Sequence, residues 1–284
     1  MMLQLGLIGY PAAHSLSPWI HHQFMSDQNI EGKYSLYEIP PGEFESKIQK
    51  IKHSSLDGFN ITVPYKEKII AYLDEIDDAA RFLGAVNTVK VENGKWIGYN
   101  TDGIGFYNSV AKRYPEALSS NKKVLLLGSG GAARGIYYAL LKQNVSTIDI
   151  ANRTEEKARK IIEDLDGTRF SKALSISDAE KKIHHYDAVI QTSSVGMSPN
   201  DDQSIVKITD IKNGSLFSDI VYRPMKTTFL KQAEALGANL HYGHEMLLYQ
   251  AAGAFEIWTD AVPDTQEIMI KFENKLRGDS NVNK

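Results

Sequence analysis

Four short segments near the start of the chain carry hydroxyl, amide and charged side chains of the kinds that bind small polar molecules. Ser15 and Ser17 place two hydroxyl groups on alternate positions just before an expected helix, an arrangement that suits a carboxylate ligand. Capping of that helix by Ser17 is the structural alternative. The other three segments are Asn60-Ile61-Thr62-Val63-Pro64-Tyr65-Lys66, Gly84-Ala85-Val86-Asn87-Thr88 and Asn100-Thr101-Asp102-Gly103. A single lysine or aspartate in a loop is usually solvated, but four such segments together call for more than a structural explanation.

A glycine-rich segment in the middle of the chain indicates a dinucleotide site. Gly128-Ser129-Gly130-Gly131-Ala132-Ala133 has the pattern G-x-G-x-x-A and lies between an expected strand and an expected helix. Backbone without side chains lets a pyrophosphate approach closely, and a helix N-terminus offers unpaired N–H groups and the positive end of the helix dipole. A merely tight turn is the alternative, but the strand–turn–helix context favours the dinucleotide.

The residues after the next strand favour NADP over NAD. An NAD site places an acidic residue about 20 residues past the glycine motif, where it binds the ribose 2′-hydroxyl. Here the strand ends in Asn152-Arg153-Thr154, Lys157 follows one helical step later, and Asp149 lies inside the strand rather than at its tip. The guanidinium of Arg153 and the ammonium of Lys157 suit a 2′-phosphate. Ordinary solvated cations at a helix start are the alternative.

Strands and helices alternate along the first hundred residues. Strands are expected at 3–9, 34–39 and 58–63, and helices at 18–28 and 43–51. Ser17 is the expected N-cap of the first helix, with Pro18 as its first residue. Asn93-Gly94, between strands expected at 87–92 and 95–99, predicts a type I′ hairpin. Such alternation favours a mostly parallel sheet.

A second series of strands and helices has the doubly wound pattern of a Rossmann-type domain. Strands are expected at 123–127, 147–151, 188–191 and 216–220, and helices at 135–142 and 155–165. Two more helices, at 246–259 and 266–276, follow a unit that is complete without them, so we expect this tail to pack on the first domain. The predicted fold class is therefore α/β with two domains.

Composition excludes several classes of protein. The 284 residues favour about two domains. A net charge of −3 and a pI near 6.3 give no electrostatic footprint for nucleic acid or an anionic membrane. The absence of cysteine removes disulfides, thiolate metal sites and cysteine nucleophiles, and the eight histidines form no H-E-x-x-H motif, so no metal is expected. No signal peptide or membrane span is recognisable, which favours a cytoplasmic protein.

Over nearly its whole length the sequence resembles the shikimate dehydrogenase family. The resemblance is carried by the glycine motif and by His14-Ser15-Leu16-Ser17-Pro18, Gly58-Phe59-Asn60-Ile61-Thr62-Val63-Pro64-Tyr65-Lys66, Gly84-Ala85-Val86-Asn87-Thr88, Asn100-Thr101-Asp102-Gly103, Asn152-Arg153-Thr154, Thr192-Ser193-Ser194-Val195-Gly196-Met197, Asp219-Ile220-Val221-Tyr222, Gly243, Met246-Leu247 and Gln250. The family reduces 3-dehydroshikimate reversibly to shikimate with NADPH, in aromatic amino-acid biosynthesis. The resemblance implies a substrate domain at 1–103, completed by 238–284, and an NADP-binding Rossmann domain at 104–237.

The resemblance also implies a role for individual residues. Lys66 and Asp102 would form the catalytic pair. The substrate carboxylate would be held by Ser15, Ser17 and Tyr222, and the substrate hydroxyl groups by Thr62, Asn87, Asp102 and Gln250. The cofactor phosphates would lie on Gly128, Ser129, Gly130, Gly131 and Ala132, and the 2′-phosphate on Asn152, Arg153, Thr154 and Lys157. The remaining cofactor contacts would be Thr192, Ser193, Ile220, Gly243, Met246 and, in the helix before Gly84, Asp78.

Ketone reduction explains why a lysine and an aspartate would be paired. Negative charge develops on the ketone oxygen, and the ammonium of Lys66 can stabilise that charge and then protonate the oxygen. Asp102 would orient Lys66, accept a hydrogen bond from a substrate hydroxyl group and help to hold the proton. Which of the two is the formal acid–base stays open, because coupled groups titrate as a pair.

The chain departs from the family pattern at a few positions. Leucine is common where His244 stands, glycine where Glu245 stands, asparagine where Gln191 stands and arginine where Lys157 stands. Two alternatives remain open: a quinate/shikimate dehydrogenase with relaxed substrate choice that accepts NAD as well as NADP, and a non-catalytic sensor of dinucleotide or shikimate. A monomer or a homodimer is expected, with no nucleic-acid or membrane partner.

Overall fold

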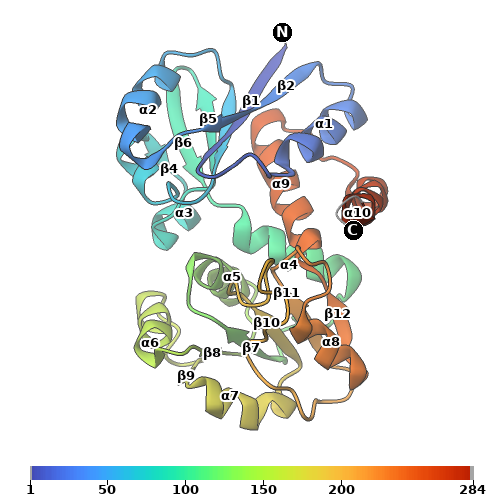
Figure 1. Ribbon diagram of the computed structural model, residues 1–284. Coiled ribbons are helices and arrows are strands. Elements are labelled where there is room, and N and C mark those ends of the chain that lie inside the picture. Colours follow the sequence, from blue (N-terminus) through green and yellow to red (C-terminus); the bar gives the residue numbers. More distant parts are fainter. Residues whose placement is uncertain (1, 282–284) are drawn as a thin grey trace. The chain divides into compact units, whose positions relative to one another are not determined.

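The computed structural model describes residues 2–281, which form two compact units (Figure 1). Of the described residues, unit 1 comprises 2–101 and 250–281, and unit 2 comprises Asp102–Tyr249. The chain thus changes unit at 102 and 250, where 104 and 238 were expected. The second boundary lies later because a strand at Asn239–His241 belongs to the sheet of unit 2 and Met246 packs in its core. Which ligand each unit binds stays a prediction at this point.

Unit 1 is built on a six-stranded sheet of mixed direction. Its strands, in spatial order, are β2 (Gly32–Glu38), β1 (Leu3–Gly9), β3 (Gly58–Ile61), β5 (Thr88–Glu92), β6 (Lys95–Tyr99) and β4 (Glu75–Ile76). β1 pairs in parallel with β2 and β3, and β4 with β6, whereas β5 is antiparallel to β3 and β6. The predicted hairpin is confirmed: Glu92 pairs with Lys95, and Asn93 and Gly94 have φ of 52° and 76°.

Helices cover both faces of this sheet. They are α1 (Ser17–Asp27), α2 (Phe44–Lys52), α3 (Asp78–Leu83), the second half of α9 (Gly243–Thr259), α10 (Thr265–Asn281), and the 3₁₀ turns Pro41–Glu43 and Lys68–Tyr72. Phe44 of α2 joins a core with Phe59 and Trp96 on one face. The last helix packs on the first (Figure 1). The rings of Trp19 and Phe272 stack between them with centroids 5.5 Å apart.

The prediction that Ser17 caps α1 was wrong. The helix already includes Ser17, because Leu16 before it has a helical backbone conformation (φ −88°, ψ −5°). The N-cap residue Leu16 makes no side-chain capping hydrogen bond, and the Ser17 N–H donates instead to the hydroxyl of Ser15 at 3.2 Å. The hydroxyl of Ser17 is therefore not used as the cap of its own helix.

Unit 2 is a doubly wound Rossmann-type fold, as the sequence predicted. Its parallel strands lie in the order β12 (Asn239–His241), β11 (Leu216–Asp219), β10 (Ala188–Gln191), β7 (Lys123–Leu127), β8 (Thr147–Ala151) and β9 (Ala173–Leu174). Counted from β7 as the first strand and read from β9 to β12, this is the order 3-2-1-4-5-6. The predicted ends of β7, β8 and β10 are confirmed. β11 stops one residue earlier than expected because the chain bends at Ile220.

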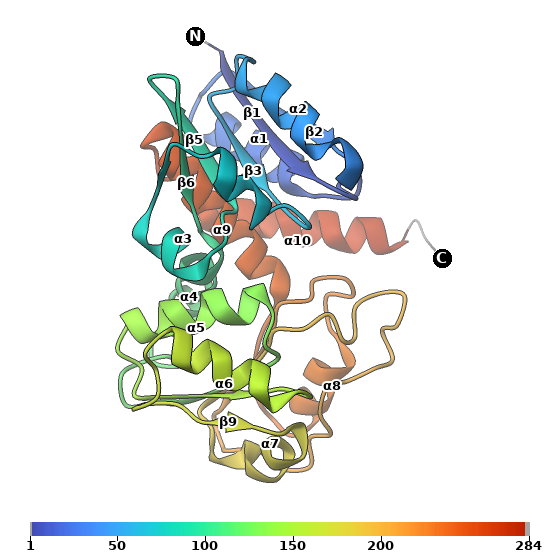
Figure 2. The same ribbon diagram turned by 90° about the vertical axis from the view of Figure 1, so that its left-hand side faces the viewer.

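Two groups of helices enclose the sheet of unit 2. They are α4 (Asp102–Arg113), α5 (Gly131–Lys142), α6 (Glu155–Asp164), α7 (Ile176–Lys182), the 3₁₀ turn Ile183–His185 and α8 (Thr228–Ala235). Val124 and Leu126 of β7 face a core that includes α4, α5 and α6, whereas Leu125 and Leu127 face one that includes α7 and α8. Figure 2 shows α5 and α6 on one side of the sheet of unit 2 and α7 on the other. No helix in the described range is long and apolar enough to cross a membrane.

Candidate functional site

A buried polar cluster in unit 1 is centred on Asn87, directly before β5. Asn87 is 2% exposed, and its Oδ1 accepts hydrogen bonds from the Thr101 N–H and the Thr88 hydroxyl, both at 2.9 Å. Its Nδ2 donates to the Thr101 hydroxyl at 3.0 Å and lies 3.5 Å from Oε1 of Gln250 on α9. The cluster therefore brings together two predicted substrate-binding residues from opposite ends of the sequence.

Asn60 on β3 belongs to the same cluster, although no role was predicted for it. Its Nδ2 donates to the Asn87 carbonyl and to the Thr88 hydroxyl, both at 3.1 Å, and its Oδ1 accepts from the phenol of Tyr34 at 2.7 Å. Burial raises the pKa of Tyr34, and a hydrogen bond with Ser17 opposes this rise. Asn60 thus links the serine segment to Asn87. Its position two residues before Thr62 on one strand face was the signal that could have identified it.

Lys66 lies in the loop that follows β3, and its backbone is fixed at two points. The Lys66 carbonyl accepts from the Val86 N–H at 2.8 Å, next to Asn87, and the Tyr65 N–H donates to the Thr62 carbonyl at 2.9 Å. The ring of Tyr65 is fully buried and stacks on Phe44 with centroids 4.1 Å apart. The side chains of Lys66 and Thr62 are partly exposed. The loop therefore holds Lys66 at a defined place beside the cluster.

Asp102 directly follows Thr101, whose N–H and hydroxyl are both bonded to Asn87. It is the first residue of α4, is partly exposed, and belongs to unit 2, whereas Lys66 belongs to unit 1. A carboxylate in the first turn is stabilised by the positive end of the helix dipole. The backbone that leads into Asp102 is therefore anchored by the polar cluster around Asn87.

The glycine loop of unit 2 has a backbone shape and an open space that would fit a phosphate group. Gly128 has φ +115°, and a Cβ there would lie 2.7 Å from the hydroxyl of Thr192, so only glycine fits. A Cβ at Gly130 or Gly131 would meet nothing within 4 Å, so packing does not explain those two glycines. The open space in front of them is what a pyrophosphate requires.

Helix α5 begins within this loop, at Gly131, earlier than the predicted start at 135. Gly131, Ala132 and Ala133 already belong to the helix, whereas Gly130 before them is extended (φ −84°, ψ −173°), and the Arg134 N–H donates to the Gly130 carbonyl at 3.0 Å. Among the described residues, no side chain caps this end. The N–H groups of the first turn therefore point toward the cradle and fit an anion.

The segment that follows β8 carries two cationic side chains and lies beside the glycine loop. The Gly128 N–H donates to the Ala151 carbonyl at 2.8 Å, which holds the ends of β7 and β8 together. Arg153 and Lys157 are exposed, as is Thr154, whose carbonyl accepts from the side chain of Asn152. This arrangement fits a 2′-phosphate.

Asp149, the acidic residue of β8, does not face the position where it could bind the ribose of NAD. It is 8% exposed and accepts hydrogen bonds from the Lys172 N–H at 2.8 Å and the Tyr186 phenol at 2.7 Å. Its carboxylate is thus engaged inside the fold and does not stand where an NAD ribose would meet it. This supports the interpretation of Arg153 as a phosphate ligand.

Three further predicted cofactor residues meet where β11 ends and α9 begins. A Cβ at Gly243 would lie 2.3 Å from the Ile220 carbonyl, so glycine is required for this close approach. Met246 is 9% exposed and packs in the core of unit 2 with Ile220 at its edge, which agrees with the packing role that is common for methionine. Tyr222, two residues after Ile220, is partly buried, and burial raises its pKa.

Asp78 is the predicted cofactor residue with the fewest structural constraints. Its side chain is 94% exposed at the first turn of α3 and pairs with Arg81 at 3.8 Å. Its contact with the cofactor stays a prediction.

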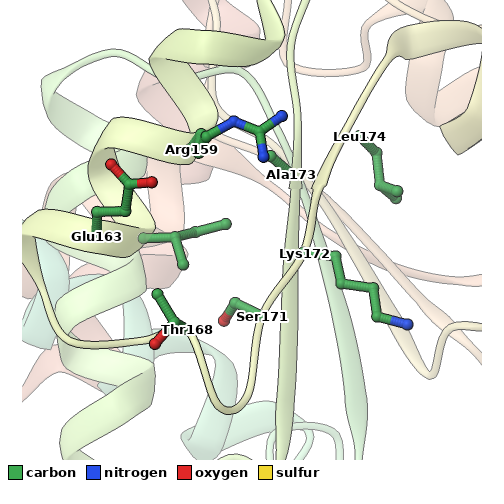
Figure 3. Close-up of a pocket in the computed structure, with 8 residues that line it drawn as sticks. Arg159, Glu163, Thr168, Ser171, Lys172, Ala173 and Leu174 are labelled. Carbon is green, nitrogen blue, oxygen red and sulfur yellow. The ribbon is translucent and has the colours of Figure 1, made fainter.

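A cavity of about 350 Å³ in unit 2 contains none of the predicted site residues (Figure 3). It lies between α6 and the segment that leads into β9, and Arg159, Ile162, Glu163, Thr168, Ser171, Lys172, Ala173 and Leu174 line it. Two of its polar groups are already paired, since Arg159 bonds to Glu155 and Ser171 to Tyr137. We assign no role to this cavity.

Comparison with known proteins covers almost the whole chain. Residues 7–89 match the model of the shikimate dehydrogenase substrate-binding domain, 109–221 that of shikimate/quinate 5-dehydrogenase, and 243–270 that of the shikimate 5′-dehydrogenase C-terminal domain. The shikimate dehydrogenase (NADP(+)) of Oceanobacillus iheyensis is 49% identical over 98% of this chain and 100% of its own length.

Solved structures agree with these sequence matches. Shikimate 5-dehydrogenase from Thermus thermophilus, in complex with NADP(H) and shikimate, has a TM-score of 0.83 and 30% identity, covering 93% of this chain and 95% of its own. Quinate dehydrogenase from Corynebacterium glutamicum, in complex with NAD, has a TM-score of 0.87 and 26% identity, covering 96% and 99%. The same fold therefore occurs with a second substrate and a second cofactor.

Proposed function

This chain belongs to the shikimate dehydrogenase family, and we propose that Lys66 and Asp102 are the catalytic pair with which it interconverts 3-dehydroshikimate and shikimate. It is an NADP-dependent oxidoreductase of aromatic amino-acid biosynthesis. In this proposal unit 1 binds the substrate and unit 2 binds NADP. We further propose a cytoplasmic enzyme that is a monomer or a homodimer.

The observation that carries the proposal is the prearranged cluster around Asn87. Amide and hydroxyl groups from Asn87, Thr101 and Gln250 are hydrogen-bonded together, and Lys66 and Asp102 adjoin this cluster through the chain segments that it anchors. Groups fixed before the substrate binds lose little freedom on binding. Ser15 and Ser17, whose hydroxyls lie 3.2 Å apart, would hold the carboxylate together with Tyr222.

The chemistry follows from the charges of the pair. NADPH, when bound, supplies the hydride that reduces the ketone carbon. The ammonium of Lys66 stabilises the negative charge on the ketone oxygen and delivers the proton there. Asp102 orients Lys66 and accepts a hydrogen bond from a neighbouring substrate hydroxyl. In the reverse direction the pair takes up the proton of the alcohol.

The cofactor side of the proposal is supported by two features of unit 2. The open space at Gly130 and Gly131 fits the pyrophosphate, and the exposed cations at Arg153 and Lys157 fit the 2′-phosphate. Thr192, Ser193, Ile220, Gly243 and Met246 would lie toward the nicotinamide. Asp78 is included as a cofactor contact on the resemblance alone.

Replacement of Lys66 tests the proposal. We expect Lys66→Ala to lower kcat by roughly 10²–10⁴-fold with a smaller change in KM, because proton transfer and charge stabilisation act in the transition state. Lys68→Ala, an exposed lysine two residues later, is the matched control and keeps wild-type turnover. Wild-type turnover in Lys66→Ala contradicts the catalytic role. A wild-type protein that binds shikimate and NADP without turnover would be the sensor that the sequence left open.

A further inference from the structure

Asp219, the last residue of β11, is a fully buried carboxylate that the proposed mechanism does not use. It is 0% exposed and receives three hydrogen bonds. The Val221 N–H donates to Oδ1 at 2.9 Å, as does the side-chain amide of Gln191 at 3.2 Å, and the hydroxyl of Thr227 donates to Oδ2 at 2.6 Å. Three donors thus converge on one carboxylate at the edge of the sheet where its strands end.

Gln191 connects this carboxylate to the neighbouring loop. It is the last residue of β10 and pairs with Asp219 across the two strands. Its side-chain oxygen accepts from the Ser193 N–H, its Nε2 also donates to the Val195 carbonyl at 3.0 Å, and its main-chain carbonyl accepts from the Ile220 N–H at 3.1 Å. The loop after β10 and the turn after β11 are therefore held by one pair of side chains.

Asp219 also holds both ends of the segment that follows β11. One oxygen of the carboxylate binds Val221 at the start of the segment, and the other binds Thr227 at its end. Thr227 is itself the N-cap of α8, and its hydroxyl accepts from the Leu230 N–H. The intervening residues, which include Tyr222, form a loop closed by a single side chain.

We propose that Asp219 is a positioning residue for the nicotinamide end of the NADP site, acting through Gln191 and Thr227 on the two loops that carry Thr192, Ser193, Ile220 and Tyr222. The inference rests on the proposed function of unit 2. β10 lies next to β7, whose end carries the glycine loop, so these loops flank the point where the strand order reverses and dinucleotides bind. A buried ion is costly, and its retention suits a task that needs one fixed arrangement.

The length of Gln191 is matched to this task. Its amide spans from Val195 in its own loop to Asp219 on the neighbouring strand. The side chain of asparagine is one methylene shorter and could not keep the same contacts to both sides. Gln191→Asn therefore loosens the connection between the two loops without introducing a charge.

The protonation of Asp219 supplies a readout that a merely structural residue would not give. Burial raises its pKa to about 6, against the three hydrogen bonds, which lower it. The groups that face it are the Gln191 amide, the Thr227 hydroxyl and the Val221 N–H, and among the described residues no charged side chain contributes to the shift. Lys226, on the following segment, is paired with Glu234 at 2.7 Å. As the pH falls through 6, one acceptor site of the carboxylate is lost.

The experiment compares wild type, Asp219→Asn and the control Asp149→Asn, a second buried carboxylate of the same sheet that bonds to Lys172 and Tyr186. KM for NADPH and kcat are measured with 3-dehydroshikimate between about pH 5 and 8, together with Tm. We expect Asp219→Asn to raise KM for NADPH at pH 7 by about fivefold, as for the loss of one hydrogen bond. We expect Asp149→Asn to lower Tm and leave KM near the wild-type value.

The pH profiles separate positioning from general stability. Wild-type KM rises below about pH 6 by the protonation of Asp219 in addition to that of the cofactor 2′-phosphate, whose pKa is about 6. Only the phosphate contribution remains in Asp219→Asn, so its profile is flatter than that of Asp149→Asn. Profiles and KM values that match wild type in Asp219→Asn overturn the inference.

Gln191→Asn keeps the inference testable where Asp219→Asn does not fold. It should raise KM for NADPH in the same direction, and an unchanged KM contradicts the proposed connection. If the variants bind NADPH like wild type and the wild-type protein is active, the inference about Asp219 fails and the proposed function stands. Wild-type protein that is folded and oxidises no NADPH defeats both, because Asp219 would then have no NADP site to position.

Discussion

The side-chain amide of Asn87 lies 3.5 Å from Oε1 of Gln250, although 163 residues separate them in the sequence. Asn87 enters unit 1 before β5, and Gln250 returns to it in the middle of α9. The polar cluster around Asn87 is therefore complete only when the last part of the chain packs on the first. In the proposed function, one ligand would therefore be bound by residues from both ends of the sequence.

Loss of the Gln250 amide should weaken substrate binding. We expect Gln250→Leu to raise KM for 3-dehydroshikimate by about fivefold, the effect of one lost hydrogen bond, with a smaller change in kcat. The control is Glu256→Gln, an exposed residue on the same helix, which should leave both constants unchanged. Steady-state kinetics at saturating NADPH measure this. An unchanged KM in Gln250→Leu would remove Gln250 from the substrate site.

Two glycines of the phosphate loop should respond differently to alanine. A Cβ at Gly130 meets nothing within 4 Å, so Gly130→Ala should keep its Tm while KM for NADPH rises by about tenfold, because the methyl group occupies phosphate space. At Gly128, φ is +115° and the Thr192 hydroxyl is close, so Gly128→Ala should lose about 1–3 kcal/mol of stability. Thermal unfolding and NADPH titration separate the two effects. A Gly130→Ala protein that binds NADPH like wild type argues against the cradle.

Arg153 should determine the preference for NADP. Removing its charge-assisted hydrogen bonds to a 2′-phosphate should lower kcat/KM for NADPH roughly 10- to 100-fold in Arg153→Ala. The value for NADH should stay the same, since NADH lacks that phosphate. Arg169→Ala, also an exposed arginine of unit 2, is the control and keeps the wild-type preference. Equal losses for NADPH and NADH in Arg153→Ala would contradict phosphate recognition.

Two buried histidines should make the protein sensitive to acid. Burial lowers the pKa of His21 in unit 1 and of His241 in unit 2 from 6.5 to about 3. Each stays neutral in the folded chain while the unfolded chain takes up a proton, so the stability they contribute is present above pH 6.5 and is lost as the pH falls toward 3. The slope is up to about 1.4 kcal/mol per pH unit for each histidine.

His241→Gln should reduce this acid sensitivity. The ring nitrogens of His241 bond to the hydroxyls of Ser109 and Ser218, so the variant is less stable at about pH 7, but the difference from wild type should shrink between about pH 7 and pH 5. The exposed His185 serves as control, because His185→Gln should keep the wild-type slope. The measurement is Tm as a function of pH. A pH dependence of Tm in His241→Gln that equals that of wild type would contradict the claim that buried, neutral His241 makes the protein sensitive to acid.

The features that the sequence predicted well depend on neighbouring residues. The Asn93-Gly94 turn and the apolar strand β7 are specified within a few residues, and both are confirmed. By contrast, Asn60 receives its bonding partners from β2 and β5, and Asp219 receives one of its own from β10. Helix α4 was also not predicted. It packs against α5 where Gly103 meets Gly135, and no local sequence pattern predicts this contact.

The most direct test is a spectrophotometric assay in which shikimate or quinate is mixed with NADP or NAD. We expect rapid reduction of the cofactor with shikimate and NADP, and little with the other combinations. Comparable rates with quinate or NAD would place the protein in the class with relaxed specificity. No reduction in any mixture, from folded protein, would contradict the assignment of a dehydrogenase.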